Sequence, residues 1–103
     1  MPKNVLLLGR KPFDDASIRA DLSDLDVAVQ TGTTIEDVSR ALAAGPVDIV
    51  IMGAGLDLDT RLAIVREVFE VSTSTSVHMK DRDSGQAGML QFVRGVLQGL
   101  TSR

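Results

Sequence analysis

The segment that most constrains the fold is Val47–Gly55, which contains five apolar residues, most of them β-branched. Gly45-Pro46 precedes the apolar run, and two glycines close it. A short apolar run between turn residues is typical of a strand that is buried on both faces. Because open parallel sheets bind ligands beyond the carboxyl ends of their middle strands, we expect any ligand site to lie near Gly53, Ala54 and Gly55.

A second continuous apolar run, Asn4–Gly9, also ends in glycine and predicts the other central strand. Two further segments, Asp26–Thr31 and Thr75–Asp81, alternate apolar and polar residues as half-exposed edge strands do. The two continuous runs occupy the middle of a four-stranded sheet only if the first and third strands are neighbours. This requirement predicts the spatial order 2-1-3-4.

Four segments with helical periodicity follow these strands. We expect the first helix to end near Leu25 and the second to end at Gly45-Pro46. The predicted apolar positions are Ile18, Leu22 and Leu25 in the first helix, Ile35, Val38, Ala41 and Leu42 in the second, Leu62, Val65, Val68 and Phe69 in the third, and Met89, Leu90, Phe92, Val93, Val96, Leu97 and Leu100 in the last.

Polar residues mark where each helix should begin. Asp14-Asp15 favours a helix N-terminus, and Thr33-Thr34-Ile35-Glu36 has the spacing of a capping box for the second helix. Asp57 or Asp59 is placed to cap the third helix, and Ser84-Gly85 should begin the last.

Strands and helices that alternate through short connections predict an α/β fold with a parallel sheet. Right-handed crossovers place the second and third helices on one face and the first helix on the other, where the last helix completes the pair. We therefore expect residues 1–103 to form a single three-layer α/β/α domain of flavodoxin-like or Rossmann-like topology.

Composition excludes several classes of function. The net charge is −3, no Lys/Arg cluster alternates with aromatic residues, and no Trp or Tyr is present to stack on a base, which argues against nucleic-acid binding. The absence of cysteine excludes disulfides and fits a cytoplasmic protein. No apolar run approaches the roughly 20 residues of a membrane span, and no signal peptide is recognisable, so we expect no membrane association.

The segment Ala41–Met52 is similar to the helix, turn and strand that precede the phosphoacceptor in response-regulator receiver domains. The resemblance implies a flavodoxin-like fold, with an aspartate at the end of this strand and an acidic pair after the first strand that holds Mg²⁺. Here Gly53 stands at the first place and Gly9 and Arg10 at the second, and a fifth strand with its lysine is missing. The resemblance therefore implies a degenerate, shortened pseudo-receiver without aspartyl phosphorylation.

The loops at the carboxyl edge of the predicted sheet gather a candidate ligand-binding set. Gly53–Leu58 begins like a dinucleotide-binding fingerprint but has Leu58 in place of its third glycine. It is compatible either with a backbone approach to a phosphate or with a tight turn into the helix. The loop charges are compatible either with anion binding or with simple solvation. The candidate residues are Gly9, Arg10, Lys11, Gly53, Ala54, Gly55 and Lys80.

His78, the only histidine, falls inside a predicted edge strand, where we expect a half-buried structural side chain. No Ser-His-Asp or Glu-x-x-His spacing is present, so we assign no catalytic residue, metal ligand or cofactor.

The apolar residues of the last helix spread beyond the single stripe that packing on one sheet face requires. We expect Met89, Phe92, Val96 and Leu100 to contact a partner, and the fourth strand to offer an unpaired edge. The leading prediction is therefore a non-enzymatic module that acts as a homodimer or binds another protein. The alternative is a binding protein or an enzyme that takes a phosphorylated or nucleotide-like molecule at the carboxyl edge of the sheet.

Overall fold

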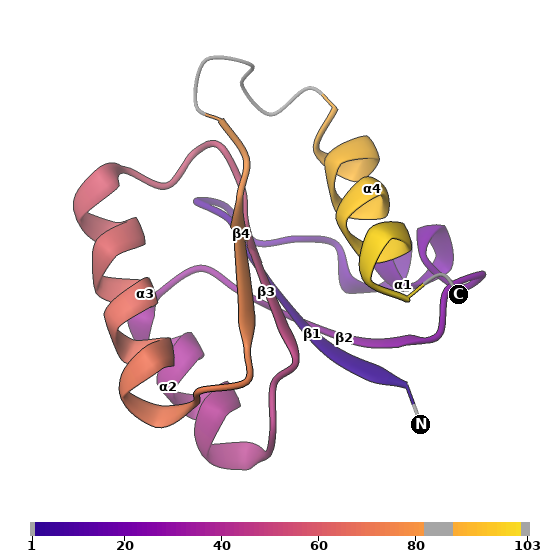
Figure 1. Ribbon diagram of the computed structural model, residues 1–103. Coiled ribbons are helices and arrows are strands. Elements are labelled where there is room, and N and C mark those ends of the chain that lie inside the picture. Colours follow the sequence, from indigo (N-terminus) through magenta and orange to yellow (C-terminus); the bar gives the residue numbers. More distant parts are fainter. Residues whose placement is uncertain (1, 82–87, 102–103) are drawn as a thin grey trace.

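Four parallel strands form the middle layer, in the spatial order β2-β1-β3-β4 (Figure 1). The structure is a computed structural model that describes residues 2–81 and 88–101. The strands are β1 (Lys3–Leu8), β2 (Val27–Gly32), β3 (Ile49–Met52) and β4 (Ser76–Met79). The predicted strand order and the predicted central pair are both confirmed.

Helices cover both faces of this sheet (Figure 1). The helices are α1 (Asp15–Asp21), α2 (Ile35–Ala44), α3 (Leu58–Val71) and α4 (Met89–Thr101). The α2–α3 pair lies on one face and the α1–α4 pair on the other, as predicted. The Cα radius of gyration is 12.6 Å, close to the roughly 13 Å expected of a domain this long. The predicted start of the last helix at Ser84-Gly85 lies outside the described residues.

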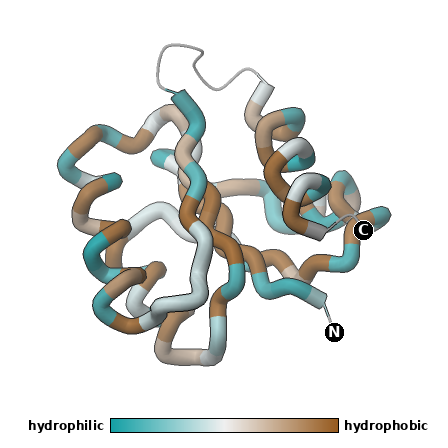
Figure 2. The backbone as a smooth tube through the Cα atoms, in the orientation of Figure 1, coloured by the Kyte–Doolittle hydropathy of each residue, from teal (hydrophilic) through white to brown (hydrophobic). Residues whose placement is uncertain are grey.

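Two-sided burial defines β1 and β3, the hydrophobic middle of the sheet in Figure 2. Their registered partners run from Val5 with Ile49 to Leu8 with Met52. Alternate side chains enter separate cores: Leu6, Leu8, Val50 and Met52 pack under α2 and α3, and Val5, Leu7, Ile49 and Ile51 pack under α1 and α4. Each of these eight side chains is at most 2% exposed, which explains why both strands read as continuous apolar runs.

Helix α1 is shorter than predicted, because it ends at Asp21 and does not reach Leu25. Asp14 caps it by accepting a hydrogen bond from the backbone N–H of Ser17 at 3.3 Å. The chain then turns, with the N–H of Leu25 donating to the carbonyl of Leu22. Leu22 is buried and Leu25 partly buried in the α1–α4 core, so the turn brings in the apolar position that the sequence assigned to helix.

The capping box of α2 lies one residue later than predicted. Thr34 is the N-cap, and its Oγ1 accepts from the N–H of Asp37 at 3.1 Å. Asp37 Oδ2 in turn accepts from the N–H groups of Thr33, at 2.8 Å, and Thr34, at 3.2 Å. The adjacent threonines offer two registers with the same spacing, and the sequence pattern selected the wrong one. Gly32 makes room for this carboxylate, since a Cβ there would lie 2.7 Å from Asp37 Cβ.

Helix α3 is rotated relative to the prediction. Leu62 and Phe69, assigned to its buried face, are 56% and 50% exposed. Val68 is buried and Val65 partly buried, as predicted, but the other buried residues are Arg61 and Ile64. Leu62 and Phe69 therefore lie on the surface of the molecule.

An ion pair fastens α4 to the segment that follows α1. Arg94 Nη1 and Nη2 donate to the two carboxylate oxygens of Asp24 at 2.9 and 2.7 Å, and Nη1 also donates to the carbonyl of Asp21 at 2.8 Å. The hydrogen bonds from Arg94 lower the pKa of the Asp24 carboxyl. Val93 and Leu97 are buried on the same helix, so both polar and apolar contacts hold α4 on this face.

The α2 cap predicts a specific pH dependence. Hydrogen bonds, first from the Thr33 N–H and then from Arg40, lower the pKa of Asp37 from 3.8 to about 2. Because the folded-state pKa lies below the unfolded value, this contribution to stability is complete above about pH 4 and is lost as the pH falls toward 2. The difference in melting temperature between wild type and Asp37→Asn should therefore shrink over that interval.

Glu36→Gln is the matched control, since it removes a charge from the same helix turn without removing a cap acceptor. Thermal unfolding followed by circular dichroism between pH 6 and pH 2 measures both differences. A destabilisation by Asp37→Asn that is the same at every pH would contradict this assignment.

Candidate functional site

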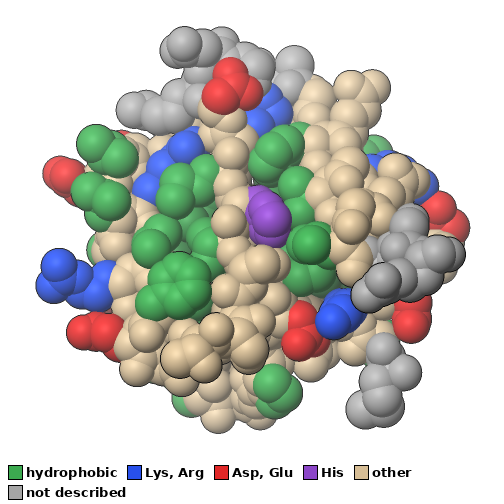
Figure 3. All heavy atoms as spheres, viewed as in Figure 1, with side chains coloured by type: hydrophobic (Ala, Val, Ile, Leu, Met, Phe, Trp, Pro, Cys, Tyr) green, Lys and Arg blue, Asp and Glu red, His purple; other side chains and the backbone are tan. Residues whose placement is uncertain are grey.

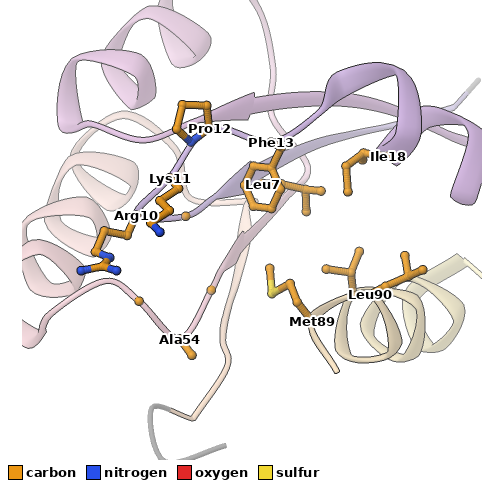
Figure 4. Close-up of a pocket in the computed structure, with 13 residues that line it drawn as sticks. Leu7, Arg10, Lys11, Pro12, Phe13, Ile18, Ala54, Met89 and Leu90 are labelled. Atoms are coloured by element: carbon orange, nitrogen blue, oxygen red, sulfur yellow. The ribbon is translucent and has the colours of Figure 1, made fainter. Parts of the chain in front are cut away.

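A crevice opens at the carboxyl edge of the sheet, where β1 and β3 end side by side (Figure 4). This is the place at which open α/β sheets bind ligands, because the connections from adjacent strands diverge there to opposite faces. The volume of the crevice is about 290 Å³. It is lined by Leu7, Gly9, Arg10, Lys11, Pro12, Phe13, Ile18, Gly53, Ala54, Gly55, Met89, Leu90 and Val93.

Six of the seven predicted ligand-binding residues line this crevice, since the loops after β1 and β3 meet there. They are Gly9, Arg10, Lys11, Gly53, Ala54 and Gly55. Lys80 is not among the lining residues that the structure describes. It follows β4, is 4% exposed, and its backbone N–H donates to the carbonyl of Met52. Lys80 therefore differs from Arg10 and Lys11, which line the crevice and are exposed.

Apolar side chains form most of the crevice wall. Figure 4 shows Leu7, Phe13 and Ile18 on one side, facing Met89 and Leu90 of α4 on the other. None of these five residues was among the predicted ligand-binding residues. In the sequence, Phe13 is distinguished only by its place just after the first strand, and Met89 only as an apolar position of the last helix. The packing of α4 against α1 brings them together.

Two glycines keep the floor of the crevice open. A Cβ at Gly9 would lie 3.0 Å from Phe13 Cζ, so the ring occupies the space that a side chain would need. A Cβ at Gly53 would lie 3.4 Å from Met89 Cε and would reduce the volume of the crevice. Neither glycine has a positive φ, so close approach rather than backbone conformation is the reason for glycine at both positions.

The charge of the crevice is entirely positive among the residues that line it. Arg10 and Lys11 are exposed, no Asp or Glu contributes to the lining, and both cations lie at the end next to Ala54 (Figure 4). Within the described part of the chain, no group of three or more Asp, Glu or His side chains is arranged to hold a metal ion. The residues that line the crevice can therefore bind an anion beside an apolar surface.

Arg61 is the residue of this region that sequence reasoning missed. Its side chain is buried at 7% exposure. Nε donates to the carbonyl of Leu56 at 3.0 Å, and Nη2 donates to the carbonyls of Gly53 at 3.0 Å and Lys80 at 2.8 Å. One guanidinium therefore holds the loop between β3 and α3 against the end of β4. No short sequence pattern reveals this role, because the three acceptors are backbone atoms.

The N-terminus of α3 is already occupied by a side chain of the chain itself. Asp57 is the N-cap, and its Oδ1 accepts from the N–H of Thr60 at 2.8 Å. A carboxylate at this position repels a phosphate and takes one of the N–H groups that a dinucleotide fingerprint offers to its ligand. Gly53–Leu58 therefore acts as a tight turn between strand and helix.

His78 is half-buried in β4, as predicted. Its Nε2 lies 3.2 Å from Ser76 Oγ, which is the second residue before it on the same side of the strand. This short polar contact within one strand supports a structural role.

The four residues of α4 predicted to contact a partner differ in their environments. Met89, Phe92 and Val96 are partly buried and pack against the core under α1 and α4. Leu100 is 40% exposed. Most of the apolar surface that the sequence assigned to a partner therefore contacts the chain's own sheet.

A second candidate surface lies around the outer edge of β4. The large hydrophobic side chains that are exposed in the described residues all belong to α3, β4 and α4: Leu58, Leu62, Phe69, Val71, Met79, Leu90 and Leu100. Figure 3 shows apolar side chains on both sides of His78, over α3 on one side and toward α4 on the other. We call the β4 edge together with Leu58, Leu62, Phe69 and Met79 the open face.

Comparison with protein-family models, with curated proteins and with solved structures finds no match for this chain. In the part of the chain that the structure describes, no helix combines the length and the apolar character needed to cross a membrane.

The role of Arg61 predicts a large effect of its removal. Arg61→Met keeps the aliphatic bulk but leaves three buried carbonyls without their donor, so we expect a loss of about 2–4 kcal/mol in the free energy of unfolding. Arg66→Met, on an exposed position of the same helix, should change it by less than about 0.5 kcal/mol. Urea denaturation measures both, and equal effects would show that Arg61 contributes only as a surface residue.

Proposed function

We propose that this protein is a non-enzymatic α/β module that acts by associating with a second copy of itself through the open face. The observation that carries the proposal is the confinement of large exposed hydrophobic side chains, among the described residues, to α3, β4 and α4. Monomeric soluble proteins rarely expose contiguous apolar patches larger than a few hundred Å². An apolar surface beside an unpaired strand edge is an interaction site by the same reasoning.

The backbone of β4 supplies hydrogen-bonding groups for this association. The N–H of Ser76 donates to Asp48 and the N–H of Lys80 donates to Met52, so these residues face β3. Because successive residues of a strand face opposite neighbours, the N–H and C=O groups of Val77 and Met79 point outward. In an antiparallel pair of β4 strands centred on His78, Val77 of each copy meets Met79 of the other. The outward groups are therefore complementary to themselves.

The exposed side chains of α3 extend the same contact. Leu58, Leu62 and Phe69 recur at the spacing of one helix face and form an exposed apolar stripe on α3. Figure 3 shows apolar side chains over α3, beside β4. A twofold axis perpendicular to the sheet, which relates antiparallel neighbours, brings the α3 helices of two copies together in opposite directions. Each stripe then covers its equivalent, and the two sheets continue across the contact.

The charge distribution favours a second copy over a charged partner. Ser76–Met79 carries no Lys, Arg, Asp or Glu, and neither do the three stripe positions of α3. The opposite edge of the sheet, at β2, has no comparable apolar flank, since the described residues of α1, β2 and α2 include no large hydrophobic side chain that is exposed. Association through β4 alone gives a closed pair rather than an open chain of molecules.

No Asp or Glu is among the residues that line the crevice at the ends of β1 and β3, which supports a role without phosphoryl transfer. Gly53, Gly9 and Arg10 occupy the places at which a receiver domain carries its phosphoacceptor and its acidic pair.

The open face predicts a dimer that single charges disrupt. The wild-type protein should sediment as a dimer at tens of micromolar. Leu62→Glu and Met79→Glu should each weaken the association at least about tenfold, because each buries an unpaired carboxylate in the contact. Sedimentation velocity over a concentration series measures the effect.

Two control variants locate the contact. Ala63→Glu adds the same charge to α3 at an exposed position outside the stripe and should leave the dimer intact. Leu100→Glu tests the end of α4, and dissociation by this variant but not by Leu62→Glu would move the contact from the open face to α4. A wild-type protein that is monomeric at every concentration would end the proposal.

A further inference from the structure

We infer that the crevice between the ends of β1 and β3 binds a small amphipathic anion, with a carboxylate or phosphate head group on a short apolar body. This inference goes beyond self-association, because the crevice lies at the carboxyl edge of the middle strands and the proposed dimer contact lies along the outer edge of β4. Either activity can therefore be present without the other.

The apolar wall of the crevice matches the apolar body of the ligand. Leu7, Phe13, Ile18, Met89 and Leu90 enclose most of it, and they come from β1, the loop after it, α1 and α4. A volume of about 290 Å³ corresponds to roughly ten water-sized groups. This is near the lower end of the range for small-molecule sites, so a single ring or a short acyl chain fits and a dinucleotide does not.

Arg10 and Lys11 are the residues that would bind the anionic head group. They are adjacent in the loop after β1 and are the charged residues of the lining, in a protein whose net charge is −3. No hydrogen bond or ion pair joins either side chain to another residue that the structure describes. A guanidinium beside an ammonium binds carboxylate or phosphate oxygens through charge-assisted hydrogen bonds.

The position of the anion follows from what is already occupied. Asp57 caps the N-terminus of α3, so the head group is held by the two cations and not by that helix. The hydrogen bond from Arg61 fixes the carbonyl of Gly53, so the loop after β3 is held in place before a ligand binds. A preformed site of this kind loses little conformational entropy on binding.

Phenyl phosphate is a suitable probe, because it joins a single ring to a dianion, and benzoate provides the carboxylate arm. In titrations followed by ¹H–¹⁵N NMR, either or both should shift the amide signals of Gly9, Gly53 and Ala54 in a saturable manner. Inorganic phosphate and phenol each lack one half of the ligand and should bind at least about tenfold more weakly than phenyl phosphate. A response to one of the two anions identifies the head group.

The double variant Arg10→Ala with Lys11→Ala should weaken binding at least about tenfold, since both side chains are exposed and their removal leaves the core unchanged. The control double variant Lys3→Ala with Arg66→Ala removes the same charge outside the crevice and should bind as the wild type does. No shift up to millimolar probe, equal binding of inorganic phosphate, or equal loss in the two double variants would overturn the inference, whatever the oligomeric state.

Discussion

Burial of β1 and β3 on both faces is the constraint on which the rest of this structure depends. Eight side chains of these strands alternate between two cores, so both faces of the sheet require helices to cover them. The same pairing brings the carboxyl ends of the two strands together, and the glycines that follow, Gly9 and Gly53, leave space there. It also makes β4 an edge strand, with one side paired to β3 and no strand of the described residues on the other. The crevice and the open face are thus both consequences of which strands lie in the middle.

Most of the architecture could be predicted because a strand that is buried on both faces has a continuous apolar sequence. Continuous apolar runs identified β1 and β3, and strand order then brought six of the seven candidate residues into one crevice. The predicted buried face of α3 was partly wrong because a polar residue, Arg61, occupies part of that face. Arg61 is buried because its guanidinium finds three backbone carbonyls, and these acceptors are invisible to a hydrophobicity pattern. Lys80 is buried and is not among the residues that line the crevice, and its place after a predicted strand could not show this.

Arg61 also connects the two surfaces of interest. Its hydrogen bond to Gly53 fixes one loop of the crevice, and its bond to Lys80 fixes the end of β4. The rotation of α3 that places Arg61 inward places Leu58, Leu62 and Phe69 outward. One buried guanidinium therefore joins the loop after β3 to the end of β4.

Completion of the outer edge of β4 by a second copy is the central proposal for this molecule. Amide hydrogen exchange at increasing protein concentration tests this claim at single residues. The N–H groups of Ser76 and Lys80 donate to the neighbouring strand and should be protected at every concentration. The outward N–H groups of Val77 and Met79 should exchange rapidly in dilute protein and become protected as the dimer forms. Rapid exchange of both outward groups at all concentrations would contradict the account.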